Sequence, residues 1–109
     1  MQPFIKEKQE ELTNLCRRYH VRRLELFGSA AAGDFEPASS DLDFLVEFEE
    51  LDPRAYADAY FGLQESLSAL YRRPVDLVIP AAVHNPYFLR SIEQNRALLY
   101  AALDQEVPF

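Results

Sequence analysis

The strongest constraint on the fold of this 109-residue chain is the alternation of apolar and polar residues over positions 41–49. Apolar side chains recur at every second position there, while most of the positions between them are acidic. This period of two is typical of a strand that buries one face. Two shorter strands are predicted at 22–27 and 75–79, the second of which ends at Pro80. The predicted buried face of the strand 41–49 consists of Leu42, Phe44, Val46 and Phe48.

Helical patterns separate these strands. Apolar residues at helical spacing predict a helix over 3–20, and Asp52-Pro53 begins a second helix that extends to about position 71. Asn85-Pro86 repeats this combination of a cap and a proline, and it predicts a final helix to about position 95. The segment 28–40 has the composition of a loop, and periodicity does not decide between strand and helix for 97–100. The expected fold is an α/β sandwich with helices on one or both faces of a sheet.

Length, charge and cysteine content narrow the class of protein. A chain of 109 residues forms one small domain, expected over 1–109. A formal net charge of −7 argues against a broad basic surface for nucleic acid and against binding to anionic membranes. The single cysteine, Cys16, excludes an intramolecular disulfide, and the sequence has neither a signal peptide nor a long apolar stretch. We therefore expect a cytoplasmic protein with no nucleic-acid or membrane partner.

Two aspartates on the predicted strand 41–49 are candidate metal ligands. Asp41 and Asp43 are two positions apart, so their side chains leave the same face, with Cβ atoms roughly 6–7 Å apart. Carboxylates at this spacing suit a pair of hard cations such as Mg²⁺ or Mn²⁺. The alternative is ordinary surface polarity of a half-exposed strand, or an aspartate that bonds its own backbone in a turn.

A third aspartate and a glycine-containing loop favour the metal site. Asp76 interrupts the apolar run from 75 to 79, where a lone carboxylate is unfavourable unless it faces solvent, a partner or a cation. Gly28 and Ser29 follow the predicted strand 22–27 and offer backbone N–H groups and a hydroxyl to a phosphate. Together these residues form a coherent candidate site.

This pattern resembles a known family. Gly28-Ser29, then Gly33, then Ser40-Asp41-Leu42-Asp43 ahead of an apolar strand, with Asp76 on a later strand, is similar to the nucleotidyltransferases of the DNA polymerase β superfamily. The C-terminal segment 92–100 and the small size resemble the minimal nucleotidyltransferase (MNT) branch. The resemblance extends over roughly residues 3 to 101 and implies a small mixed β-sheet packed with helices.

The resemblance also implies an activity, nucleotidyl transfer from ATP with two Mg²⁺ ions (or Mn²⁺). In that scheme Asp41 and Asp43 hold both ions, Asp76 completes one site and helps to deprotonate the acceptor hydroxyl, and Gly28 and Ser29 contact the β- and γ-phosphates. One position departs from the branch, because Ala32 stands where its members usually carry arginine. The loss of a guanidinium from a phosphate loop removes a bidentate contact and bears on activity. Arg72 and Arg90 are alternative sources of that charge.

The partner follows from the resemblance too. Members of the MNT branch typically pair with a helical HEPN protein as antitoxin and toxin, which implies AMP transfer to a hydroxyl of the toxin, most simply that of a tyrosine. A chain of this length leaves no room for an acceptor domain, so the acceptor is expected in trans or in a homo-oligomer. The alternative function is an inactive MNT-like module that neutralises or recruits a helical partner by complex formation.

Overall fold

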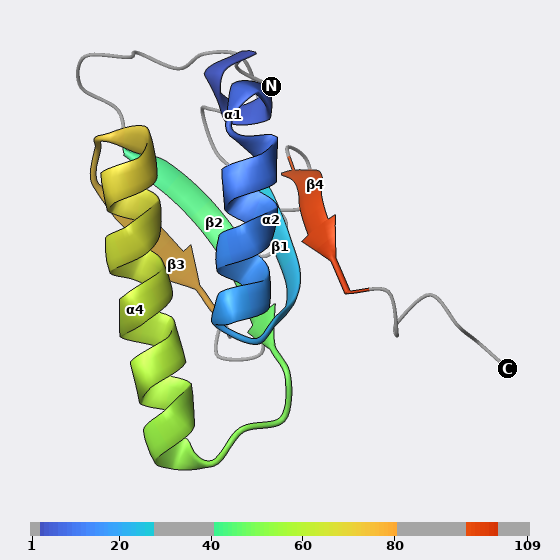
Figure 1. Cartoon of the computed structure of the whole chain (residues 1–109), viewed down its shortest axis with the longest axis vertical. Helices are drawn as coiled ribbons and strands as arrows, with labels where there is room; N and C mark the ends of the chain where they lie inside the picture. Colours follow the sequence, from blue (N-terminus) through green and yellow to red (C-terminus); the bar gives the residue numbers. More distant parts are fainter. Residues whose placement is uncertain (1–2, 28–40, 81–95, 103–109) are drawn as a thin grey trace, which may run out of the picture.

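A helical layer covers one face of a four-stranded sheet in the computed structural model, which describes residues 3–27, 41–80 and 96–102 (Figure 1). The helices are α1 (Pro3–Glu7), α2 (Gln9–Arg18) and α4 (Pro53–Tyr71). The strands are β1 (Val21–Phe27), β2 (Leu42–Phe48), β3 (Val75–Val78) and β4 (Arg96–Ala101). The predicted loop 28–40 and the predicted helix 86–95 lie outside the described residues.

The sheet is mixed, with strand order β3-β2-β1-β4. Strand β1 pairs antiparallel with both β2 and β4, whereas β2 and β3 run parallel. A parallel pair needs a crossover connection, and α4 supplies it. The segment 97–100, which periodicity left undecided, lies within strand β4. The predicted strands at 22–27 and 75–79 are confirmed to within one residue at their ends.

The N-terminal helical region is divided, contrary to the single helix predicted over 3–20. Lys8 separates α1 from α2, and its N–H reaches back only three residues, to the carbonyl of Ile5 at 3.3 Å. This tighter turn interrupts the regular α-helical hydrogen bonding, so α1 and α2 are separate helices. The second helix ends at Arg18, and His20 adopts a left-handed backbone with φ of 59° before β1 begins.

Helix α4 begins and extends as predicted. The Asp52 carboxylate accepts a hydrogen bond from the Ala55 N–H at 2.8 Å, and Pro53 occupies the first turn. Two of its side chains bond to the outer edge of β3. The Tyr60 hydroxyl donates to the Leu77 carbonyl at 2.7 Å, and the Gln64 amide donates to the Val75 carbonyl at 3.0 Å. These bonds fix α4 against the strand that carries Asp76 and satisfy edge carbonyls that would otherwise be open to pairing.

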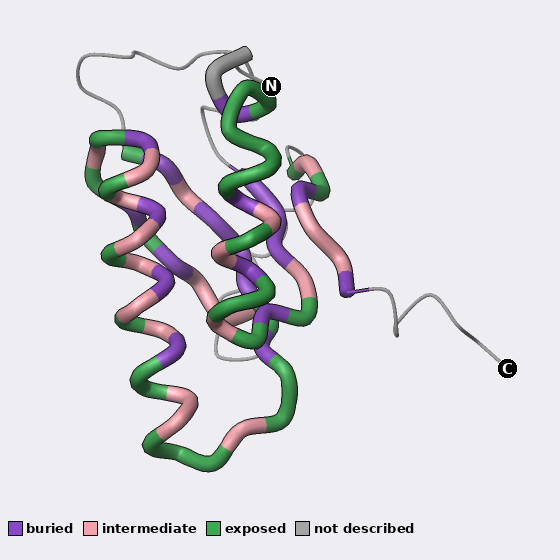
Figure 2. Tube along the Cα trace, in the orientation of Figure 1, coloured by how far each residue is buried: buried purple, intermediate pink, exposed green. Residues whose placement is uncertain are grey.

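The main core lies between the helices and the sheet, where the buried residues of Figure 2 line the facing sides of both layers. It includes the whole predicted apolar face of β2, which is buried and consists of Leu42, Phe44, Val46 and Phe48.

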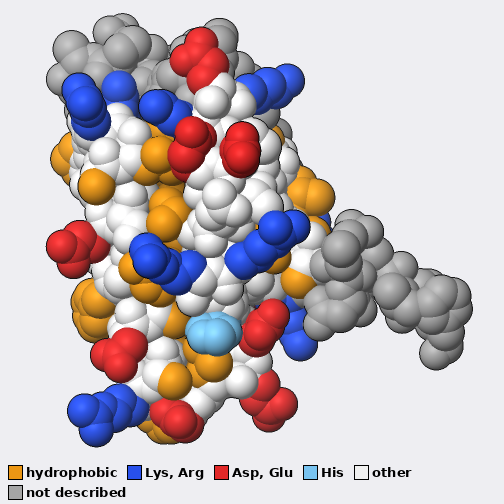
Figure 3. All heavy atoms as spheres, viewed as in Figure 1, with side chains coloured by type: hydrophobic (Ala, Val, Ile, Leu, Met, Phe, Trp, Pro, Cys, Tyr) orange, Lys and Arg blue, Asp and Glu red, His pale blue; other side chains and the backbone are white. Residues whose placement is uncertain are grey.

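On the exposed helix face, acidic and basic side chains are interspersed rather than gathered by sign (Figure 3). None of the helices that the structure describes is long and apolar enough to cross a membrane. The opposite face of the sheet carries the polar positions of the strands, among them two of the predicted site residues, Asp43 and Asp76.

Candidate active site

The sheet face away from α2 and α4 combines a small apolar cluster with acidic residues. Phe27 and Leu45 are buried there, with Val78 packed against them, separately from the main core. Alternation along β2 and β3 brings Asp43 and Asp76 to the same face as this cluster. A strand that continues the apolar core on one side therefore presents carboxylates on the other.

Asp43 and Asp76 are direct neighbours in the parallel ladder between β2 and β3. Their carboxyl groups lie close enough to interact through charge and, when Asp43 is protonated, through a side-chain hydrogen bond. The pKa of Asp43 is raised from 3.8 to about 6, first by burial, then by the charge of Asp76 and this hydrogen bond, and last by the charge of Asp41. Asp43 therefore holds its proton to a higher pH than an ordinary aspartate, as expected where neighbouring carboxylates form a site that favours positive charge.

Asp41 lies at the edge of this pair. It precedes β2, is exposed, and contributes to the high pKa of Asp43 through its charge. Across residues 3–27, 41–80 and 96–102, no three acidic, histidine or cysteine side chains come together as a ready-made metal site. The structure thus brings together two of the three predicted aspartates and leaves Asp41 nearby. Gly28, Ser29, Ala32 and Arg90 lie outside the described residues, and Arg72 is the exposed C-cap residue of α4.

A hollow of about 380 Å³ opens beside the paired carboxylates. Its lining includes Phe27, Asp43 and Asp76 from the sheet, with Tyr60 and Gln64 from α4. Oxygen ligands of this kind suit Mg²⁺ or Mn²⁺, which commonly take one or two protein carboxylates and complete their coordination with phosphate oxygens and water. The donor set therefore fits a hard divalent cation shared with a phosphorylated ligand.

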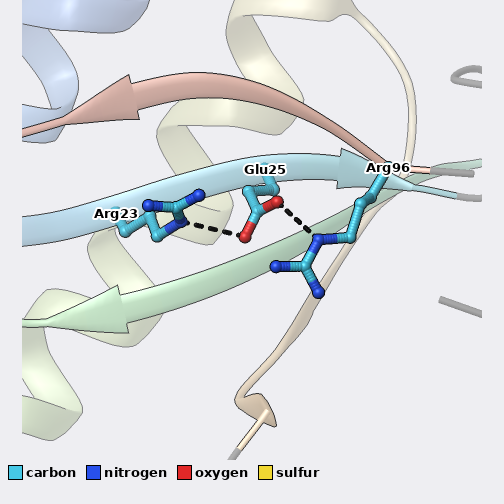
Figure 4. Close-up of polar contacts among 3 residues, drawn as sticks. All are labelled: Arg23, Glu25 and Arg96. Carbon is cyan, nitrogen blue, oxygen red and sulfur yellow. Dashed lines mark hydrogen bonds and ion pairs between the residues drawn. The ribbon is translucent and has the colours of Figure 1, made fainter. Parts of the chain in front are cut away.

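An ion cluster that sequence reasoning missed occupies the same sheet face. Glu25 is buried, with only 9% of its side chain exposed, and each of its carboxylate oxygens meets an arginine (Figure 4). Arg23 Nε lies 3.1 Å from one oxygen, and Arg96 Nε lies 2.8 Å from the other. In the sequence, Glu25 was only a polar position in an alternating strand. A signal was nonetheless present, because a glutamate between Leu24 and Leu26 at the centre of a sheet needs a cationic partner.

The sequence profile of the nucleotidyltransferase domain matches residues 9–99. The chain belongs to the nucleotidyltransferase domain family. Among its relatives is the proposed protein adenylyltransferase MJ1379 of Methanocaldococcus jannaschii, which is 37% identical over 78 residues and matches over 72% of this chain and 76% of the relative. This membership confirms the family predicted from the aspartate pattern.

Solved structures confirm the nucleotidyltransferase fold. A proposed minimal nucleotidyltransferase superposes with a TM-score of 0.68 at 28% identity, over 84% of this chain and 89% of that chain. A chain from the complex of a tri-AMPylated Shewanella oneidensis HEPN toxin with an MNT antitoxin superposes with a TM-score of 0.61 at 18% identity, over 94% of this chain and 76% of that chain. The second likeness bears on the fold alone. The predicted architecture, a small mixed sheet packed with helices, is thus confirmed.

Proposed function

We propose that this protein is a nucleotidyltransferase of the antitoxin type, which transfers AMP from ATP to a tyrosine hydroxyl of a HEPN-type partner. The observation that carries the proposal is the pairing of Asp43 with Asp76 on the open face of the sheet, beside a hollow large enough for part of a nucleotide. The name of the relative MJ1379, a proposed protein adenylyltransferase, supports AMP as the group transferred and a protein as the acceptor. The Shewanella oneidensis complex, in which an MNT antitoxin holds an AMPylated HEPN toxin, supports the class of partner.

The three aspartates are proposed to bind the metal ions. Asp43 and Asp76, with Asp41 beside them, would hold divalent Mg²⁺ or Mn²⁺, and the metal would neutralise the triphosphate and stabilise the leaving pyrophosphate. Asp43 contributes as a partly buried carboxylate between the other two. Gly28 and Ser29, outside the described residues, are proposed to contact the β- and γ-phosphates with backbone N–H groups and a hydroxyl.

Transfer to the acceptor requires the removal of one proton. The acceptor hydroxyl oxygen forms a bond to the α-phosphorus of ATP, the bond from that phosphorus to the bridging oxygen breaks, and pyrophosphate leaves. Asp76 is proposed to accept the hydroxyl proton, because it is exposed while its neighbour Asp43 is half-buried. A tyrosine suits this chemistry, since its phenol has an ordinary pKa near 10 and loses its proton more easily than an aliphatic alcohol.

The proposal is tested with the purified protein, Mg²⁺, ATP and a HEPN-type protein, taken from the neighbouring gene where that gene encodes one. Intact-mass spectrometry of the partner should show added AMP with the wild-type chain, and peptide mapping should place it on tyrosine. Asp43→Asn and Asp76→Asn should abolish the addition. Glu47→Gln is the matched control, because Glu47 lies on the same strand as Asp43 and is exposed.

A complex that forms without any addition of AMP, and that persists unchanged in both aspartate variants, would instead support the inactive binding module. Addition of AMP to serine, threonine or lysine would retain the enzyme and overturn the choice of tyrosine. Addition that continues in Asp43→Asn and Asp76→Asn would overturn the site itself.

A further inference from the structure

A single row of paired residues crosses all four strands of the sheet at the end that carries the aspartates. Asp76 on β3 pairs with Asp43 on β2, Asp43 pairs with Phe27 on β1, and Phe27 pairs with Arg96 on β4. Residues that pair directly across a ladder present their side chains on the same face. Arg96 therefore shares the face of the paired carboxylates, separated from Asp43 by one intervening strand.

The guanidinium of Arg96 is held in place by Glu25. Its Nε lies 2.8 Å from a Glu25 oxygen (Figure 4). The Arg96 side chain remains 40% exposed, in contrast to the buried carboxylate that anchors it. A guanidinium carries five N–H donors, and the Nε contact uses one of them. Arg96 therefore presents pre-oriented donors to solvent on the face of the candidate active site.

Charge balance sets this contact apart from an ordinary ion pair. Arg23 already neutralises Glu25, with Nε at 3.1 Å from the other oxygen. The second guanidinium gives the three-residue cluster a net charge of about +1, if all three groups are ionised. This positive charge lies on a sheet face that otherwise carries Asp43, Asp76 and Glu47. Within the described part of the chain, the cluster is a fixed cationic spot beside an anionic one.

We infer that Arg96 binds phosphate oxygens of the nucleotide whose cations are held at Asp43 and Asp76. The inference rests on the proposed function and adds a residue to its site. Two strand spacings separate Asp43 from Arg96, or about 9–10 Å between backbones. A single ion or water does not span that separation, whereas a triphosphate extends from a metal site toward a second cation. A guanidinium suits the far end, because its planar fork matches phosphate oxygens and stays charged at every relevant pH.

Isothermal titration with ATP and with AMP, both with Mg²⁺, separates this role from a structural one. Arg96→Gln should weaken binding of ATP about tenfold or more, because a charge-assisted hydrogen bond to phosphate is lost, and should leave AMP within twofold. Arg23→Gln is the matched control. This substitution removes the other contact to Glu25. Because Arg23 pairs with Glu47, away from the row that contains the aspartates, the substitution should leave the affinities for ATP and AMP within twofold of the wild type.

The ratio of ATP affinity to AMP affinity in each variant removes any effect of partial misfolding, which lowers the apparent binding of both ligands together. An unchanged ratio in Arg96→Gln, or an equal loss of ATP binding in both arginine variants, would overturn the role of Arg96 and leave the proposed function standing. A wild-type protein that binds neither nucleotide with Mg²⁺ would overturn both.

Discussion

Replacing Asp43 by Asn should stabilise the metal-free protein at neutral and alkaline pH. The side chain keeps its shape and can still donate a hydrogen bond to Asp76, but it no longer places a second negative charge beside that carboxylate. In the folded protein the pKa of Asp43 is about 6, compared with an ordinary value of 3.8. The folded state therefore binds more protons between these values than the unfolded chain does, and the wild-type free energy of unfolding falls as the pH rises through this window.

The size of the effect follows from the same two values. Their difference corresponds to about 3 kcal/mol at about 1.36 kcal/mol per unit of pKa. Because Asp43 is only half-buried, solvent screening reduces this to about 1–1.5 kcal/mol. We expect Asp43→Asn to exceed the wild type by that amount above about pH 6, and to show no advantage below about pH 4.

Urea denaturation in the presence of a chelator, repeated across this pH range, measures the difference. Glu47→Gln is the control, because Glu47 is exposed on the same strand and should change stability by less than about 0.5 kcal/mol. Added Mg²⁺ should reverse the order, since a cation at a hundred times its dissociation constant stabilises the wild type by about 2.7 kcal/mol, more than the deficit caused by the paired charges. An Asp43→Asn protein no more stable than Glu47→Gln at about pH 8, or a difference independent of pH, would show that Asp43 is not destabilised by its charged neighbours.

Three further outcomes test the scaffold. Gly62→Ala should destabilise the protein by about 1 kcal/mol in thermal melts, because the new Cβ would lie 2.5 Å from a ring carbon of Tyr19; in a Tyr19→Ala background the same change should become neutral or stabilising. Asp52→Ala should cost about 1 kcal/mol through loss of the N-cap bond to α4, whereas Asp58→Ala, at an exposed position in the second turn of that helix, should change stability little. Cys16 is buried, and its pKa is raised to about 12, so a thiol reagent should label it only after unfolding; rapid labelling of the native protein would contradict this packing.

The sequence was sufficient to predict much of the fold because its signals are local. Alternation identified β2, and the Asp52-Pro53 pair marked the start of α4 to the residue. The division at Lys8 was not predictable from periodicity, since the apolar residues on both sides keep helical spacing. Strand β4 remained undecided because its pairing with β1 depends on residues far apart in the chain.

The candidate site, like the fold, could be predicted from the sequence only as far as local patterns determine it. The residue types and their spacing indicated the aspartates, but the contact between Asp43 and Asp76 depends on the register of the parallel ladder, which no local pattern encodes. The link from Glu25 to Arg96 was still less accessible, because a shift in register between Leu24 and Glu25 decides which residue of β4 lies opposite.

The phosphate group that reaches the partner distinguishes nucleotidyl transfer at the paired aspartates from phosphoryl transfer and from simple binding. The most direct measurement supplies the HEPN-type partner with ATP labelled at the α-phosphate and, in parallel, with ATP labelled at the γ-phosphate. We predict that only the α-label becomes attached to the partner, that the γ-label is released in pyrophosphate, and that Asp43→Asn and Asp76→Asn abolish both events while Glu47→Gln preserves them. Attachment of the γ-label, or attachment of the α-label that survives both aspartate substitutions, would rule out nucleotidyl transfer at this aspartate pair.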